Sequence, residues 1–175
     1  MVAGAVTAAA KHPNIEVLLL GPAAVVEQQL EALPDVPPNI QIVDAPEVIG
    51  MHEAPMEALR SKPRSSIALA TAMHKKGEVD AFVSAGNTGA VAGAASLNLN
   101  RVKGVRRPGL AVPMKAINSV CVGIDMGANI QAKSDHLYQY GIMASVFAHL
   151  ILEIESPRVG LLNIGEEESK GTKLV

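Results

Sequence analysis

Aromatic residues are nearly absent from this chain. It has two Tyr, two Phe and no Trp among 175 residues, although 49% of its residues are hydrophobic. The core must therefore be built from Ala, Val, Leu, Ile and Met, whose small side chains let backbones approach closely. So few rings exclude a base-stacking platform, and a net charge of −2 gives no general attraction to a phosphate backbone. Nucleic acid is not an expected partner.

Cysteine is limited to a single residue, Cys121. One cysteine can form neither an internal disulfide nor a thiolate cage for a metal, which fits a reducing compartment. Cys121 lies in the apolar run VCVGID, so we expect a buried core residue and not a nucleophile. The five histidines show no metal-binding spacing, and no Ser, His and Asp trio stands out. We therefore expect no metal, no cofactor and no serine-hydrolase chemistry.

The chain also lacks a hydrophobic run long enough to cross a membrane. Its longest apolar stretch, residues 141–152, contains His149 and falls short of the roughly 20 residues that a spanning helix needs. The opening residues, MVAGAVTAAAKHP, have no basic flank before the apolar segment and do not resemble a secretory signal. We expect a cytoplasmic protein with one domain, residues 1–175, because this length suits a single core.

Short apolar runs alternate with helical segments along the chain. Strands buried on both faces are predicted at Ile15–Leu20, Ile40–Val43, Ala81–Ser84, Leu110–Val112, Val120–Asp125 and Val159–Ile164. Helices are predicted at the start of the chain and at Ala23–Ala32, Ser65–Lys76, Gly89–Leu97 and His136–Leu152. This alternation predicts an α/β fold with βαβ units and a mainly parallel sheet covered by helices on both sides.

Glycine follows four of the predicted strands, at Gly21, Gly86, Gly127 and Gly165. In open parallel sheets ligands bind beyond the carboxyl ends of the strands, so these turns are candidates for one shared site. Glycine also makes tight turns for purely structural reasons, and for Gly21 alone we favour that interpretation.

The segment VSAGNTGAVAGA joins a predicted strand to a helix of small residues. At such a turn the backbone N–H groups and the positive end of the helix dipole point to the same region, which suits a phosphate. Gly86 and Gly89 let the backbone approach an anion without an intervening Cβ. Ser84 and Thr88 add hydroxyl groups, and Asn87 adds an amide. The pattern matches neither the dinucleotide fingerprint nor the P-loop, so a structural turn is the alternative, but we favour phosphate binding.

Two later segments carry further candidate residues. In GIDMGAN, the Asn129 amide can donate to a developing oxyanion and Asp125 can fix the loop, with a purely structural turn as an equal alternative. In LLNIGEEESKG, Asn163 ends a predicted strand and Lys170 follows three acids. Adjacent carboxylates point in different directions, so we favour a solvated helix start over a divalent-ion site.

Basic residues cluster in two places. One cluster consists of Arg60, Lys62 and Arg64, and the other lies within residues 101–107. Each cluster either docks an acidic partner or forms an ordinary solvated face, and for the second cluster we favour the solvated face.

In this order, the motifs resemble the bacterial phosphate acyltransferase family, PlsX. The resemblance is carried by EVIGMHEAPMEALRSKPRSS, GEVDAFVSAGNTGAVAGA, RVKGVRRPGLA, DMGAN, HLYQYGIMASVFA and PRVGLLNIGEEESKG, and it extends over nearly the whole chain. The opening strand of the family and everything after Val175 are absent, so the chain corresponds to roughly the first half of a member. Arg106 and Ala54 also stand where the family commonly has acids, and residues 114–119 look shortened.

The resemblance implies a reaction and a fold. Inorganic phosphate attacks the thioester of an acyl group carried on acyl carrier protein, and the acyl phosphate formed serves phospholipid synthesis. The implied fold is a three-layer α/β/α sandwich, similar to phosphotransacetylases and isopropylmalate dehydrogenases. The implied assembly is a homodimer that works in the cytoplasm next to the membrane.

On this basis we assign provisional roles within the chain. Asn87 and Thr88, with Ser84 and the backbone of Gly86 and Gly89, are expected to bind phosphate. The oxyanion donor is expected to be Asn129 or Asn163, while Arg60, Lys62 and Lys170 are expected to attract the anion or the partner.

Two alternatives stay open at this stage. One is a non-catalytic domain that binds phosphate or acyl carrier protein. The other is a phosphotransacetylase that acts on acyl coenzyme A.

Overall fold

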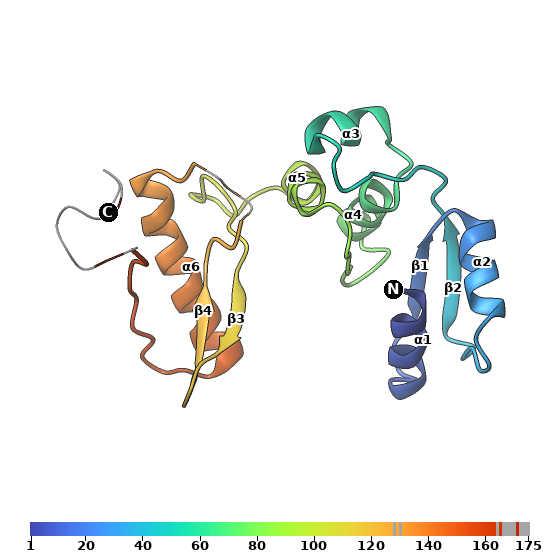
Figure 1. The fold of residues 1–175 in the computed structure, drawn as a ribbon, viewed down its shortest axis with the longest axis horizontal. Helices are drawn as coiled ribbons and strands as arrows, with labels where there is room; N and C mark the ends of the chain where they lie inside the picture. The colour runs from blue at the N-terminus through green and yellow to red at the C-terminus, as the bar shows by residue number, and fades with distance from the viewer. Residues whose placement is uncertain (128, 130, 164, 166–170, 172–175) are drawn as a thin grey trace. The chain divides into compact units, whose positions relative to one another are not determined.

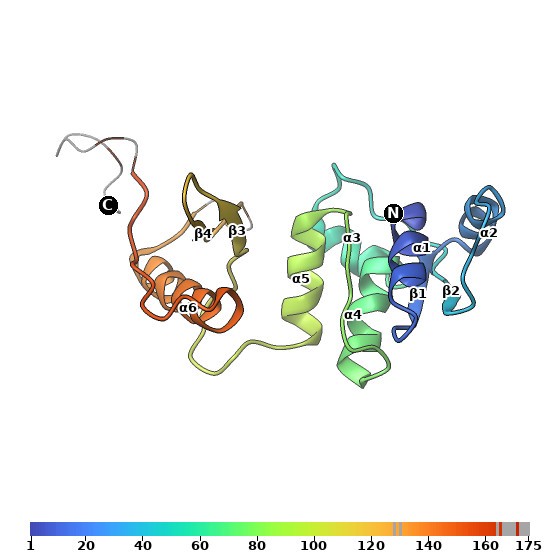
Figure 2. The same cartoon turned by 90° about the horizontal axis from the view of Figure 1, so that it is seen from below.

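The structure, a computed structural model, describes residues 1–127, 129, 131–163, 165 and 171. The chain forms two compact units, Met1–Asn100 and Arg101–Val175. Both contain helices and strands (Figures 1 and 2), so the predicted α/β class is confirmed. The three-layer sandwich and the single domain over residues 1–175 stay predictions.

The first half of the Met1–Asn100 unit is built on a pair of parallel strands. Its elements are α1 (Val2–Lys11), β1 (Val17–Gly21), α2 (Ala23–Glu31) and β2 (Ile40–Asp44). The strands pair in register from Val17 opposite Ile40 to Gly21 opposite Asp44. The connection between them includes a helix, as a parallel pair requires. At the end of β2 the Asp44 carboxylate accepts a hydrogen bond from Ala23 N, 3.1 Å away, and so ties β2 to the start of α2.

Three helices make the core of the second half of this unit. They are α3 (Pro55–Ser61), α4 (Ser66–Lys76) and α5 (Thr88–Asn98). The buried cluster consists of Ile49, Ala58, Ile67, Ala90 and Ala94. Three of these five residues are alanines, which agrees with the close packing of small side chains that the composition predicts.

The ends predicted for the helix at Ser65–Lys76 are confirmed by α4. The side chain of Ser65 accepts a hydrogen bond from Ala68 N at the start of the helix, 3.4 Å away, and Gly77 ends the helix with a φ of 73°. A serine N-cap and a left-handed glycine are frequent signals for the two ends of a helix. The sequence pattern missed α3, because seven residues are too few to show a helical period.

The Arg101–Val175 unit contains a hairpin and one long helix. Strands β3 (Val112–Lys115) and β4 (Val120–Gly123) pair antiparallel, and α6 (Ser134–Leu152) contacts β4. The predicted parallel pairing is therefore wrong for these two strands. Only residues 116–119 connect them, whereas a crossover between parallel strands needs a dozen or more residues. Helix α6 confirms the predicted helix in this region. None of the described helices is long and apolar enough to cross a bilayer.

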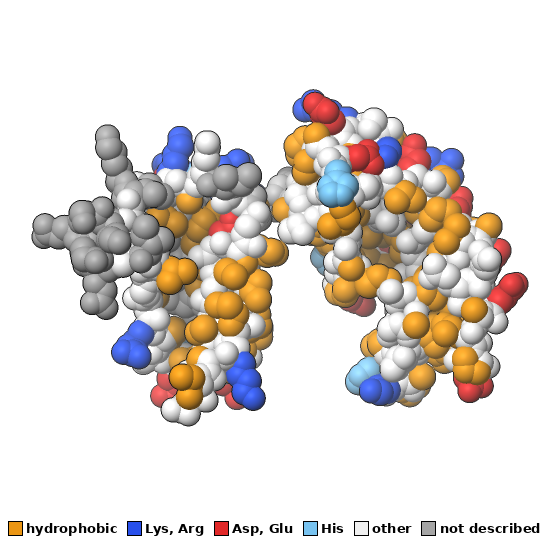
Figure 3. Space-filling model, in the orientation of Figure 1, with side chains coloured by type: hydrophobic (Ala, Val, Ile, Leu, Met, Phe, Trp, Pro, Cys, Tyr) orange, Lys and Arg blue, Asp and Glu red, His pale blue; other side chains and the backbone are white. Residues whose placement is uncertain are grey.

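Two predicted strands are wrong within the described residues. Neither the predicted strand at Ala81–Ser84 nor the described part of the one at Val159–Ile164, residues 159–163, has strand conformation, and Val83 and Leu162 are 85% and 95% exposed. The strand predicted at Leu110–Val112 shares only Val112 with β3, which continues to Lys115. A strand needs a hydrogen-bonded neighbour, and an apolar pattern does not say whether a neighbour is there. Exposed hydrophobic side chains are visible on both units in Figure 3.

The expected burial of Cys121 is also wrong. Cys121 lies in β4, as the apolar run predicts, but its side chain is exposed. Its sheet has only two strands, so side chains that alternate along β4 face opposite sides and are not all covered by α6.

Candidate functional site

The predicted phosphate-binding turn leads directly into α5, an eleven-residue helix. Asn87 is the N-cap residue, and its Oδ1 accepts a hydrogen bond from Ala90 N, 3.0 Å away. Asparagine favours this position because its short side chain reaches the free N–H groups of the first turn. The structure therefore confirms the helix start at the turn and gives Asn87 a capping role.

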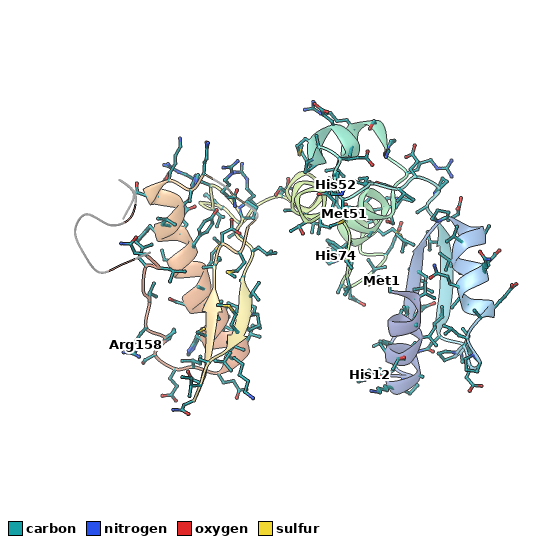
Figure 4. The ribbon with its side chains drawn as sticks, in the orientation of Figure 1. Met1, His12, Met51, His52, His74 and Arg158 are labelled. Carbon is teal, nitrogen blue, oxygen red and sulfur yellow. The ribbon has the colours of Figure 1, made fainter. Side chains whose placement is uncertain are left out.

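The other end of the Asn87 amide binds a loop from a distant part of the sequence. Its Nδ2 donates to the carbonyl oxygens of Gly50, Met51 and Glu53, at 3.2, 3.4 and 3.1 Å. Figure 4 labels Met51, which lies in this loop. Asn87 is only 6% exposed, and both polar atoms of its side chain bind the protein. The Asn87 side chain thus supports the turn, because both its oxygen and its nitrogen bind groups of the protein.

Both glycines of the turn are in close contact with neighbouring side chains. A Cβ on Gly89 would lie 2.6 Å from Pro55 Cγ, and one on Gly86 would lie 3.3 Å from Ile67 Cδ1. Gly86 N donates to Ser84 Oγ, 3.2 Å away. The need for glycine at position 89 is therefore explained by the approach of α3, a reason that the sequence pattern did not indicate.

The groups that remain available to a ligand are at the first two residues of α5. Val91 N donates to Asn87 O, 3.0 Å away, and Ala90 N donates to the Asn87 side chain. Within the described residues, no acceptor meets the N–H groups of Thr88 and Gly89. The Thr88 side chain is exposed. Two free amides and a hydroxyl at a helix N-terminus form an arrangement that suits an anion.

An ion pair holds the loop that binds Asn87. Lys62 Nζ lies 2.6 and 2.7 Å from the two carboxylate oxygens of Glu53 and donates to Val48 O at 2.8 Å. Gly50 N donates to Glu53 Oε1, 2.6 Å away. The hydrogen bond from Lys62, together with that from Gly50, lowers the pKa of Glu53 below its ordinary value. Lys62 therefore neutralises a partly exposed carboxylate of the same unit, while Arg60 is exposed on α3.

The second predicted turn, in the Arg101–Val175 unit, is closed by hydrogen bonds of its own. The Asp125 carboxylate accepts from Leu110 N at 2.8 Å and from Asn129 N at 2.7 Å. Gly127 lies between Asp125 and Asn129 in the sequence and has a φ of 102°, a conformation that favours glycine. The expectation that Asp125 fixes this loop is confirmed.

Asn129 uses its amide within the same turn. Its Nδ2 lies 2.9 Å from Asp125 Oδ2, 2.9 Å from Pro108 O and 2.8 Å from Tyr140 Oη. Tyr140 is 2% exposed, and its pKa is raised by burial and then by the Asp125 charge, against an opposing effect of Arg107. The Asn129 side chain thus links three segments of this unit.

The remaining predicted residues lie near the end of the chain. Asn163 is half-buried, and its Nδ2 donates to Gly165 O, 3.1 Å away. Lys170 lies outside the described residues. Among the described residues no group of three His, Cys, Asp or Glu side chains is arranged to hold a metal ion.

Sequence reasoning missed the residues that support the two turns. Glu53, Pro55 and Tyr140 were not candidates, although each contacts a residue that was. Glu53 and Asn87 are 34 positions apart, and nothing in either local pattern indicates their contact. The basic cluster that contains Lys62 was the one local signal for this region, because a lysine can pair with an acidic residue such as Glu53.

Comparison with known proteins identifies the family. The model of a family described as fatty acid synthesis protein matches residues 1–175. The chain belongs to this family. A phosphate acyltransferase from Desulfitobacterium hafniense is 46% identical over 163 residues, which cover 92% of the chain and 48% of that protein. Phosphate acyltransferases from Oleidesulfovibrio alaskensis and Salinibacter ruber are 42% and 44% identical, over 100% and 93% of the chain and 50% and 48% of those proteins.

These family relatives agree with the resemblance to phosphate acyltransferases that the motifs indicate. The chain spans about half the length of the curated relatives it matches. The turn at residues 84–89 and the turn at residues 125–129 lie within the matched range. The first turn belongs to the Met1–Asn100 unit and the second to the Arg101–Val175 unit.

Proposed function

We propose that this chain is the acceptor-binding part of an enzyme that transfers a fatty acyl group from acyl carrier protein to inorganic phosphate. The observation that carries the proposal is the family match over residues 1–175, together with relatives that are named phosphate acyltransferases. The product, an acyl phosphate, would enter phospholipid synthesis.

In this proposal phosphate lies at the start of α5. The N–H groups of Thr88 and Gly89 and the Thr88 hydroxyl donate to its oxygens, and the positive end of the helix dipole favours its charge. Asn87 holds these donors in place, because its side chain caps the helix and binds the residue 50–53 loop. Ser84 and Gly86 stay proposed phosphate-binding residues of this turn, in which Gly86 N donates to Ser84 Oγ.

The chemistry requires little beyond position and electrostatics. A phosphate oxygen attacks the thioester carbonyl carbon, a C–O bond forms, and the tetrahedral intermediate collapses as the C–S bond breaks and the carrier thiolate leaves. Phosphate is already a nucleophile at neutral pH. Holding it in line with the carbonyl can contribute on the order of 7–11 kcal/mol.

The oxyanion role concerns the Asn129 and Asn163 side chains. An oxyanion donor contributes about 3–4 kcal/mol to the transition state. The side-chain amides of Asn129 and Asn163, proposed from the sequence, both donate to acceptors within the protein. We therefore assign Asn129 to positioning of the residue 125–129 turn. Arg60 and Lys170 stay proposals for attraction of the anion or the partner.

The resemblance supports further proposals about the assembly. We propose that the whole protein is a homodimer with a three-layer α/β/α fold, and that it works in the cytoplasm with peripheral contact to the membrane. The parallel β1–β2 pair is the part of the described structure that agrees with such a sheet.

The test of activity compares two acyl donors with the 175-residue chain. The chain is incubated with phosphate and either acyl carrier thioester or acyl coenzyme A, and acyl phosphate is trapped with hydroxylamine. We expect phosphate-dependent product with the carrier thioester. Product only with the coenzyme A donor would support a phosphotransacetylase, and binding of phosphate or carrier without product would support a non-catalytic domain.

Thr88→Val tests the location of the site. The variant keeps the shape of the side chain and loses the hydroxyl donor. We expect the KM for phosphate to rise about 10- to 100-fold, because a hydrogen bond to a charged group is worth about 1.5–3 kcal/mol. An unchanged KM would remove Thr88 from the site. Thr7→Val is a matched control, since Thr7 Oγ1 donates to Ala3 O in α1, away from this turn.

A further inference from the structure

A series of hydrogen bonds connects Lys62 with the start of α5. Lys62 binds Glu53, Glu53 closes its own loop through Gly50 N, and the carbonyls of that loop bind Asn87. Asn87 then caps the helix whose first N–H groups are proposed to bind phosphate. No step in this series exceeds 3.4 Å.

The ion pair acts on the loop at two points. Lys62 Nζ donates to Val48 O at 2.8 Å, just before the loop, and to Glu53 at its end. The Glu53 carboxylate accepts from Gly50 N at 2.6 Å, while Glu53 N donates to Gly50 O at 3.3 Å. The pair therefore joins both ends of residues 48–53 and sets the direction of the carbonyl groups between them.

Asn87 depends on that direction for its own position. Its Nδ2 has three acceptors, and all three are backbone carbonyls of residues 50, 51 and 53. The residue is 6% exposed, so water cannot easily replace an acceptor that moves away. A shift of the loop would therefore move or tilt Asn87, and with it the first turn of α5.

We propose that the Glu53–Lys62 ion pair positions the turn at residues 84–89 for phosphate. It does so by holding the three carbonyl groups that bind the Asn87 amide. Glu53 and Lys62 are thus positioning residues that need not touch the substrate. This inference rests on the proposed function, because it assigns the aligned N–H groups of Thr88 and Gly89 to phosphate.

A second ion pair of the Met1–Asn100 unit, Lys76–Glu78, serves as a comparison. Lys76 and Glu78 lie 3.5 Å apart near the end of α4, and their side chains are 66% and 48% exposed. The Lys62 and Glu53 side chains are 31% and 38% exposed and lie 2.6 Å apart. Exposed pairs contribute little, whereas a shorter and more covered pair with added hydrogen bonds holds its geometry better. Lys76→Met is therefore a matched control for Lys62→Met.

The experiment uses the 175-residue chain and five variants: Lys62→Met, Glu53→Gln, the double variant, Lys62→Arg and the control Lys76→Met. Inorganic phosphate is titrated while the amide resonances of Thr88 and Gly89 are followed by NMR. Where the chain turns over, the KM for phosphate and the KM for the acyl donor are measured separately.

We expect Lys62→Met and Glu53→Gln each to weaken phosphate binding about 10-fold, because either change displaces the charge-assisted hydrogen bonds from the turn to phosphate. The double variant should be no weaker than the singles, since both remove one interaction. Lys62→Arg should restore most of the affinity, and Lys76→Met should leave it unchanged. The KM for the acyl donor should not move.

Two results would overturn the positioning role. One is an unchanged phosphate affinity in Lys62→Met and Glu53→Gln. The other is an equal rise in the KM for phosphate and the KM for the acyl donor, with neither value restored by Lys62→Arg. That result would indicate a general loss of structure.

Failure of the proposed function is recognised by a separate measurement. If the unmodified chain binds no phosphate, exchange of the Asn87 side-chain NH2 protons still reports the position of the turn. Faster exchange in Lys62→Met, but not in Lys76→Met, would then support the positioning of the turn, and equal exchange would refute it.

Discussion

The packing of α3 against α5 makes a sharp prediction for Gly89→Ala. A Cβ at this position would lie 2.6 Å from Pro55 Cγ and 3.3 Å from Pro55 Cβ. The proline ring is rigid and occupies the first turn of α3, so it cannot rotate away. The two helices must therefore move apart at the start of α5, where the proposed phosphate donors are.

The expected cost follows from two opposing effects. Inserting a methyl group into a packed contact costs about 1–3 kcal/mol. Replacing glycine by alanine in a helix gains at most about 1 kcal/mol, and less in the first turn. We expect the free energy of unfolding of the Met1–Asn100 unit to fall by about 1–2 kcal/mol, the difference between these effects.

Gly4→Ala is the matched control, because it makes the same substitution in α1 where no atom lies within 4 Å of the new Cβ. It should stabilise the unit by about 0.5–1 kcal/mol. Adding Pro55→Ala to Gly89→Ala removes the ring atoms and should recover part of the loss, a non-additive result.

The assay combines urea unfolding, followed by circular dichroism, with hydrogen exchange of α5 and α6 peptides. Exchange in α5 should accelerate in Gly89→Ala while exchange in α6 stays the same. If Gly89→Ala were as stable as the unmodified chain, or gained as much as Gly4→Ala, the close contact between α3 and α5 would be refuted.

Two further predictions concern buried polar groups. Asn87→Ala removes a helix cap and leaves three partly buried carbonyls without their donor. Unfolding in urea titrations should therefore become easier by about 2–4 kcal/mol, against about 1 kcal/mol for the simple cap in Ser65→Ala. Equal losses would contradict the role of the residue 50–53 loop. The variant Tyr138→Phe leaves Tyr140 as the only tyrosine. Because the pKa of Tyr140 is raised in the folded chain, its neutral phenol stabilises the fold. This contribution is fully present below about pH 10, the ordinary pKa of tyrosine, and is lost as the pH rises through the folded-state pKa. Phenolate absorbance should therefore emerge above pH 10 together with the loss of near-ultraviolet dichroism, and a normal titration in the folded chain would contradict the burial.

Much of the local structure could be predicted from the sequence. Ser65 and Gly77 marked the ends of α4, and a run of small residues after Asn87 marked α5. These signals are local, since a capping side chain and a left-handed glycine act within a few residues of the backbone that they satisfy. The motif order likewise indicated the family, which the match over residues 1–175 confirms.

Pairing of strands was less predictable. The segments around β1 and β2 pair in parallel as expected, whereas residues 81–85 have no strand partner in the described chain. An apolar run looks the same in both cases, because the hydrogen bonds that make a strand come from a different segment. Exposure of Cys121 was missed for the same reason, since coverage of a sheet face depends on the elements around it.

The sequence by itself determined the composition of the core, the positions of most helices and the glycine turn that begins α5. Only the tertiary structure decided what the polar residues of that turn do. Asn87 could face a ligand or the protein, and it faces the carbonyls of residues 50–53, held by the Glu53–Lys62 pair. The physical reason is that a buried amide must satisfy its hydrogen bonds, and the acceptors that satisfy it lie 34 to 37 positions away along the chain.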